Sequence, residues 1–127
     1  MQTGHEGSGP SRNVGIGRLI RAWGYSMKGL RAAWRDEAAF RQEIVGILIA
    51  IPLALWLPAR WSESLLLIAV LFVVPLVELL NSAIEALADA VSDEHRPLLG
   101  QAKDIGSAAV LVSLLIAALV WCAVLIP

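Results

Sequence analysis

The sequence has little charge, few aromatic residues and a single cysteine. Charged residues make up 17% of its 127 residues, below the level of about a quarter that is usual for soluble domains, whereas 57% are hydrophobic. The lone Cys122 excludes an intramolecular disulfide framework and any multi-cysteine zinc or iron–sulfur site. A formal net charge of −1 excludes a broadly basic nucleic-acid binder. A short, apolar chain of this kind is typical of a small membrane protein.

The common motifs of soluble nucleotide-binding and metal-binding proteins are also missing. The sequence contains neither a G-x-x-x-x-G-K-[ST] phosphate loop nor a protein-kinase catalytic loop. It contains no Glu-x-x-His pair, which argues against a di-iron site. Nucleotide or metal chemistry in this chain would therefore use a different arrangement of residues.

The first part of the chain divides into a polar tail and an amphipathic helix. Residues 1–13 are rich in glycine and polar residues, and we interpret them as a mobile tail without the features of a signal peptide. Residues 14–35 show helical periodicity, with apolar residues such as Leu19 and Trp23 on one face and only basic charges on the other. This pattern is typical of a helix that lies on an anionic membrane surface.

Three apolar stretches follow, and they predict three transmembrane helices over about 39–59, 64–91 and 104–126. A helix needs about 20 residues to cross a bilayer, and of the three uncharged runs (44–57, 64–77 and 105–126) only the last is that long by itself. The first two helices therefore extend at their ends. Pro52 and Pro75 lie inside two of the spans, where we expect kinks rather than helix ends.

The basic residues predict how the chain is oriented in the membrane. Seven Lys and Arg residues precede the uncharged run of the first span (44–57), and the first loop contains only Arg60. The positive-inside rule then places the N-terminus in the cytoplasm. Three crossings place residues 92–104 on the cytoplasmic side as well and the C-terminus outside.

The second predicted span carries a row of polar residues, Glu78, Asn81, Ser82, Glu85 and Asp89, that share one helix face. At about 1.5 Å per residue from Ser64, Glu78 lies roughly 21 Å along the helix and Glu85 roughly 32 Å. The row therefore runs from the cytoplasmic half of a hydrocarbon core of about 30 Å into water. Ionisable groups are costly at such depths and indicate a functional site. This site suits a reaction between a lipid and a water-soluble molecule.

Further charged residues are predicted near the same interface. Carboxylates lie where the surface helix meets the first span, and a mixed group lies at 94–104; together these are Asp36, Glu37, Glu43, Glu94, His95, Arg96, Lys103 and Asp104. Several carboxylates with a lysine indicate magnesium and phosphate chemistry, since hard cations prefer oxygen ligands. The residues alone leave two other interpretations open, a polar seam between subunits and an ion or proton path.

Four ordered blocks of the sequence resemble the bacterial integral-membrane diacylglycerol kinase family. They are AWGYSMKGLRAAW (22–34), EAAFRQE (37–43), ELLNSAIE (78–85) and AKDIGSAAV (102–110). The resemblance implies an all-α homotrimer in the bacterial inner membrane, with the active site on the cytoplasmic side. It also implies transfer of the γ-phosphate of MgATP to the primary hydroxyl of diacylglycerol, giving phosphatidic acid.

The resemblance also implies roles for individual residues. Glu78 is the expected catalytic base, Glu37 and Glu85 the expected Mg²⁺ ligands, and Asn81 their neighbour. The residues expected to contact ATP are Arg18, Tyr25, Glu37, Glu85, Glu94, His95, Arg96, Lys103 and Asp104. Those expected to contact the lipid substrate are Arg18, Ser26, Arg31, Ala39, Glu43, Trp56, Glu78, Ser107 and Trp121.

Two alternatives to a diacylglycerol kinase remain at this stage. A sister group with a similar frame phosphorylates undecaprenol, and the residues named above do not separate the two lipid substrates. A small oligomeric ion or proton channel would also place Glu78 and Glu85 inside a helix bundle.

Overall fold

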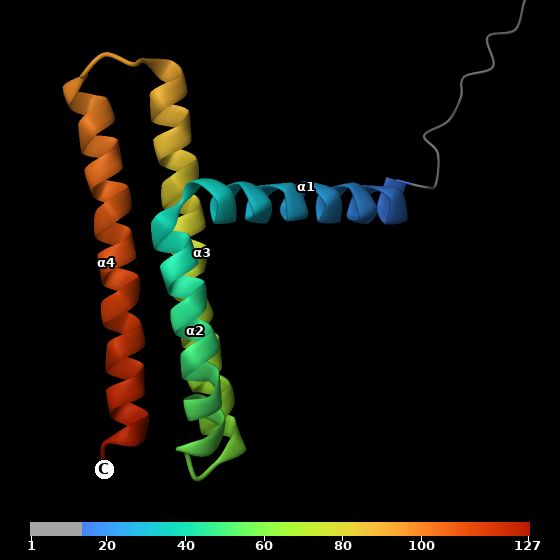
Figure 1. Ribbon diagram of the computed structural model, residues 1–127, viewed down its shortest axis with the longest axis vertical. Helices are drawn as coiled ribbons and strands as arrows, with labels where there is room; N and C mark the ends of the chain where they lie inside the picture. Colours follow the sequence, from blue (N-terminus) through green and yellow to red (C-terminus); the bar gives the residue numbers. More distant parts are fainter. Residues whose placement is uncertain (1–13) are drawn as a thin grey trace, which may run out of the picture. The chain divides into compact units, whose positions relative to one another are not determined.

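A computed structural model describes residues 14–127 and shows an all-helical chain (Figure 1). The helices are α1 (Val14–Asp36), α2 (Ala38–Trp56), α3 (Trp61–Val91) and α4 (Pro97–Leu125). The last three are each long and apolar enough to cross a membrane, which confirms the predicted fold class of a helical membrane protein. The predicted polar tail, residues 1–13, lies outside the described residues.

The chain divides into two compact units, the first ending at Ala32 and the second comprising Ala33–Pro127. Within the first unit, the described residues form one amphipathic helix, most of α1. Among the described residues of this unit, the helix has no second element against which to bury its apolar face. The placement of α1 on a membrane surface and the assignment of the whole chain to one domain stay predictions.

The helix boundaries differ from the sequence-based expectation most clearly in α4. This helix begins at Pro97 rather than near residue 104. Proline is favoured at the first helical position because its φ angle is already helical and its missing N–H would have no intrahelical partner there. As a consequence, Lys103 and Asp104 lie on α4 itself, and the connection between α3 and α4 consists only of residues 92–96.

Neither internal proline ends its helix. Helix α2 continues through Pro52, and α3 continues through Pro75. Helix α3 is also fixed at its start, where the backbone N–H of Arg60 donates to Oε2 of Glu63 at 3.3 Å. This hydrogen bond satisfies one of the free backbone N–H groups at the helix N-terminus.

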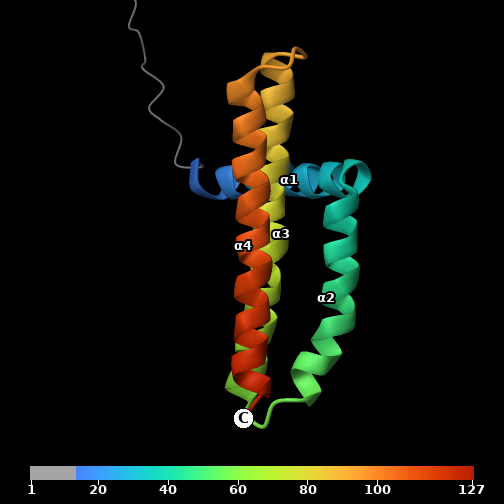
Figure 2. The ribbon, with the colours of Figure 1, turned by 90° about the vertical axis from the view of Figure 1, so that its left-hand side faces the viewer.

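Helix α3 is the centre of the second unit, because it packs against both α2 and α4. Figures 1 and 2 both show α3 and α4 side by side over most of their lengths. Their contact includes a small apolar cluster of Val70, Val74 and Ala117, against which Val120 and Trp121 pack. The buried residues of α4 are all small (Gly106, Ser113 and Ala117), and small residues let helix backbones approach closely.

Most large apolar side chains of the three spans face outward. Leu48 on α2, Leu80 on α3 and Leu119 on α4 are 64%, 60% and 69% exposed. An apolar surface of this extent is unfavourable in water, and it fits contact with lipid chains or with further copies of the chain.

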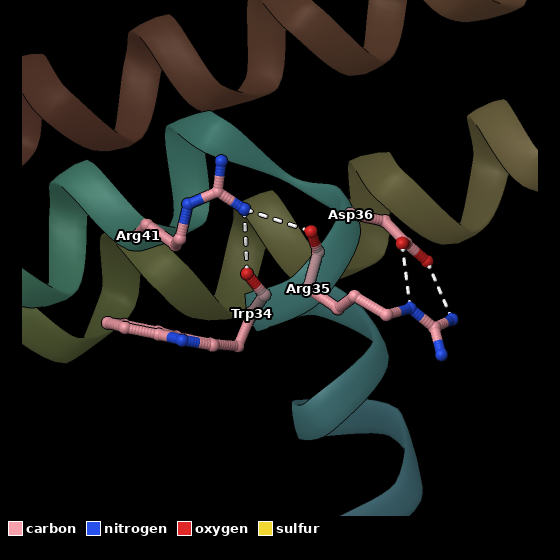
Figure 3. Close-up of polar contacts among 4 residues, drawn as sticks. All are labelled: Trp34, Arg35, Asp36 and Arg41. Atoms are coloured by element: carbon pink, nitrogen blue, oxygen red, sulfur yellow. Dashed lines mark hydrogen bonds and ion pairs between the residues drawn. The ribbon is translucent and has the colours of Figure 1, made fainter.

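The junction between α1 and α2 is held by the side chain of Arg41 (Figure 3). Its Nη1 donates to the carbonyl oxygens of Trp34 at 2.8 Å and Arg35 at 3.0 Å, in the last turn of α1. These carbonyls have no intrahelical partner, so a basic side chain is favourable there. The adjacent ion pair joins Arg35 to Asp36, and its hydrogen bonds hold the pKa of Asp36 below its ordinary value. Glu37, an expected metal ligand, sits at this junction as the residue before α2.

The Arg41 contacts are expected to stabilise the junction more than the Arg35–Asp36 ion pair does. We expect Arg41→Gln to lower the free energy of unfolding by about 1 kcal/mol, because it removes two hydrogen bonds from a charged donor to helix-end carbonyls. Arg35→Gln is the control, since exposed ion pairs contribute little. Denaturant unfolding in detergent, followed by circular dichroism, checks this. Equal losses in the two variants would contradict it.

Candidate active site

The polar row of α3 is present, and its first part is buried. Glu78 is 5% exposed and Asn81 is 7% exposed, whereas Glu85 is only half-buried. Nδ2 of Asn81 donates to Oε1 of Glu85 at 3.4 Å, which links two residues one helical turn apart. Burying a carboxylate costs free energy. A buried carboxylate in a membrane-spanning helix therefore indicates a functional role.

Other carboxylates of the second unit lie around Glu78. Those of Glu37, Glu43 and Glu85 are all close enough to interact with it electrostatically. Oε2 of Glu43 is buried and has no hydrogen-bond partner among the described residues. The structure therefore gathers acidic groups from α2, α3 and the α1–α2 junction around one position on α3.

The residues around Glu85 fit a magnesium ion that arrives with a nucleotide. Within residues 14–127, no three His, Cys, Asp or Glu side chains are grouped closely enough to hold a metal. Magnesium is usually held by one or two protein carboxylates together with substrate phosphates and water, so a complete protein cage is not required. An oxygen ligand is available in the half-buried carboxylate of Glu85, whereas Oδ1 of Asn81 lies against Gly106 and is buried without a hydrogen-bond partner in the described part of the chain.

A pocket of about 280 Å³ lies where α3 ends and α4 begins. It contains five of the residues expected to contact ATP, namely Glu94, His95, Arg96, Lys103 and Asp104. Its α3 wall includes Ala88 and Asp89, one turn beyond Glu85. The structure therefore brings these residues together in one cavity, next to the Asp89 end of the polar row.

The pocket also contains two acidic residues that are not among the predicted site residues, Asp89 and Asp93. Nζ of Lys103 on α4 pairs with Oδ1 of Asp89 on α3 at 2.5 Å. Asp89 belongs to the predicted polar row, and this position in the row is the feature of the sequence that indicates its place in the site. The pocket is lined by four carboxylates and two permanent cations. These carboxylates would repel the phosphates of a nucleoside triphosphate, and a divalent cation bound to the phosphates would reduce that repulsion.

The remaining predicted site residues are more scattered. Ala39, Trp56 and Ser107 are exposed on the second unit, and Trp121 packs against the α3–α4 cluster with its Nε1 buried and unpartnered among the described residues. Four others, Arg18, Tyr25, Ser26 and Arg31, lie in the first unit. Their predicted contacts with ATP or lipid stay predictions.

Comparisons with known proteins identify the family of the chain. The sequence profile described as prokaryotic diacylglycerol kinase matches residues 24–125. The chain is 50% identical over 115 residues to a diacylglycerol kinase of Escherichia coli strain K12, covering 91% of this chain and 94% of that protein. It is 46% identical over 113 residues to one of Pseudomonas aeruginosa, covering 89% and 92%. A diacylglycerol kinase of Helicobacter pylori is 42% identical over 112 residues, covering 88% of each chain.

The profile match covers the whole second unit except its last two residues, including the polar row and the α3–α4 pocket. The chain therefore belongs to the prokaryotic diacylglycerol kinase family and is a membrane kinase.

Proposed function

We propose that this protein transfers the γ-phosphate of MgATP to the primary hydroxyl of diacylglycerol and so produces phosphatidic acid. The observation that carries the proposal is the row of polar residues on α3, which begins at the buried Glu78 carboxylate and ends at Asp89 in the wall of the α3–α4 pocket. It can bring a lipid alcohol and a water-soluble phosphate donor to one site. The names of the relatives supply the identity of the alcohol.

In this proposal Glu78 is the catalytic base. Its carboxylate accepts the proton of the lipid hydroxyl while the hydroxyl oxygen forms a bond to the γ-phosphorus. The bond between that phosphorus and the bridging oxygen of ADP breaks at the same time. Phosphoryl transfer depends mainly on alignment and charge stabilisation, so one base beside an aligned phosphate meets most of the requirement.

The other residues align and neutralise the donor. Lys103 and Arg96 supply positive charge to the phosphates in the pocket, and Glu94, His95 and Asp104 line the rest of it. Glu37 and Glu85, with Asn81 beside them, would hold the magnesium ion that accompanies ATP. When bound, this ion neutralises phosphate charge.

We also propose that the protein works as a homotrimer in the bacterial inner membrane, with the pocket on the cytoplasmic side. The excess of basic residues before α2 supports this orientation. The outward-facing apolar side chains of α2, α3 and α4 support contacts with further copies. Light scattering of the purified protein in detergent tests the assembly, and a monomeric or dimeric mass for active protein would contradict it.

The reaction itself can be tested by following labelled phosphate. Purified protein in mixed micelles with diacylglycerol is incubated with ATP labelled either in the γ-phosphate or in the α-phosphate. We expect only the γ-label to enter the lipid, in a product that comigrates with phosphatidic acid. No label in the lipid, together with ion flux through liposomes that contain the protein, would contradict the proposal and favour a channel.

Asp89 is expected to compete with ATP for Lys103. Because Asp89 adds negative charge to the pocket and pairs with Lys103, we expect Asp89→Asn to lower the KM for ATP about twofold to fivefold. Steady-state kinetics over a range of ATP concentrations measures this. The effect should disappear in a Lys103→Gln background, and a raised KM in the single variant would show that Asp89 supports nucleotide binding instead.

A further inference from the structure

Helices α3 and α4 approach each other closely where Gly106 meets Asn81. Gly106 is buried on α4, and the three atoms nearest to a Cβ added to it would all belong to the side chain of Asn81. That Cβ would collide with Oδ1 of Asn81 and would lie 3.3 Å from its Cγ and 3.8 Å from its Cβ. The backbone of Gly106 has an ordinary helical conformation, so the requirement for glycine comes from space and not from φ.

No other glycine in residues 14–127 is restricted in this way. A Cβ at Gly15, Gly17, Gly24, Gly29 or Gly46 would have no neighbour within 4 Å, and at Gly100 the nearest atom would be 4.0 Å away. Alanine stabilises a helix relative to glycine by about 1 kcal/mol. At most of these positions alanine is therefore compatible with the structure, whereas Gly106 avoids a specific collision.

The Asn81 side chain is held between a hydrogen bond to Glu85 and the contact with Gly106. Asn81 is 7% exposed, its Nδ2 donates to Oε1 of Glu85, and its Oδ1 is buried without a partner among the described residues. A methyl group at position 106 would push the amide away from α4 and rotate it. The rotation would break the hydrogen bond to Glu85 and leave that carboxylate free to reorient.

We propose that Gly106 is a positioning residue. Its missing side chain sets the orientation of the Asn81 amide, and that amide holds the Glu85 carboxylate in place. The consequence for magnesium rests on the proposed function, in which Glu85 is a ligand of the ion that accompanies ATP. Groups that orient metal ligands in this way typically change metal affinity by about 10-fold to 100-fold when they are altered.

The first test is metal binding by the full-length protein in detergent. Mn²⁺ replaces Mg²⁺, and its binding is measured by electron paramagnetic resonance with a non-hydrolysable ATP analogue present. We expect Gly106→Ala to weaken Mn²⁺ binding about tenfold and to raise by a similar factor the Mg²⁺ concentration for half-maximal activity. Gly46→Ala, a matched control in α2 with open space around it, should change neither by more than about twofold. Equal effects of the two variants would overturn the proposal.

A double-mutant cycle separates positioning from simple helix packing. If Gly106 acts through Asn81, Gly106→Ala should cause no further loss of Mn²⁺ affinity or thermal stability in an Asn81→Ala background, because the collision is gone. If Gly106→Ala alone does not fold, the double variant should fold again. A double variant that loses as much as the two single variants together, or that does not fold, would overturn the proposal.

The cycle also distinguishes this inference from the proposed function. If the wild-type protein binds Mn²⁺ with the nucleotide but transfers no phosphate to diacylglycerol, the proposed function fails and the cycle still decides the role of Gly106. If the wild-type protein shows no nucleotide-dependent Mn²⁺ binding, the positioning role for a metal ligand is overturned.

Discussion

Glu78→Gln is expected to reduce kcat by about a thousandfold or more and to change the KM for ATP by less than about twofold. Glutamine has nearly the same shape as glutamate but cannot accept the proton of the lipid hydroxyl, and general base catalysis typically contributes about 10²-fold to 10⁴-fold. The ATP-contacting residues lie further along α3 and on α4, so nucleotide binding should persist. Initial rates of labelled phosphate transfer to diacylglycerol measure the effect.

Glu63→Gln is the matched control for this variant. It makes the same change on the same helix, but at the opposite end, where Glu63 only accepts a hydrogen bond from the backbone of Arg60. Its kcat should stay within about twofold of the wild-type value. A Glu78→Gln protein with near-normal kcat would remove Glu78 from the role of base.

Lys103→Gln is expected to weaken ATP binding more than any other single change in the pocket. Lys103 is one of only two permanent cations there, and a hydrogen bond from a charged group contributes about 1.5–3 kcal/mol. We therefore expect the KM for ATP to rise about 10-fold to 100-fold, while the KM for diacylglycerol changes little. Kinetics with each substrate varied in turn, supported by calorimetric titration with a non-hydrolysable ATP analogue, measures this difference.

The only other lysine, Lys28, provides the control, since it is not among the residues expected to contact ATP or the lipid substrate. Lys28→Gln should leave the KM for ATP within about twofold of the wild-type value. If both lysine variants bind the analogue as tightly as the wild type, the α3–α4 pocket is not the nucleotide site.

Much of the fold could be predicted from the sequence because membrane insertion imposes simple requirements. Long apolar stretches predicted three spanning helices, and all three are present. Helical periodicity placed Glu78, Asn81 and Glu85 on one face of one helix, since that relation depends only on local geometry. The first two of these residues are indeed buried together on α3.

Contacts between residues on different helices could not be predicted from helical periodicity. The Asp89–Lys103 pair and the Gly106–Asn81 contact both join α3 to α4, and periodicity within one helix carries no information about which residues meet on another. The predicted start of the third span, near residue 104, is also later than the start of α4 at Pro97, because the charged residues before position 104 are typical of a loop. Pro97 at the first helical position was the local signal for the earlier start.

The most direct test of the account compares two lipid alcohols under identical conditions. Wild-type protein and Glu78→Gln are each given γ-labelled ATP with diacylglycerol or with undecaprenol in mixed micelles, and the initial rate of label entering each lipid is measured. We predict rapid labelling of diacylglycerol by the wild type, far slower labelling of undecaprenol, and almost none of either by Glu78→Gln. Faster labelling of undecaprenol, or equal labelling by the two proteins, would contradict it.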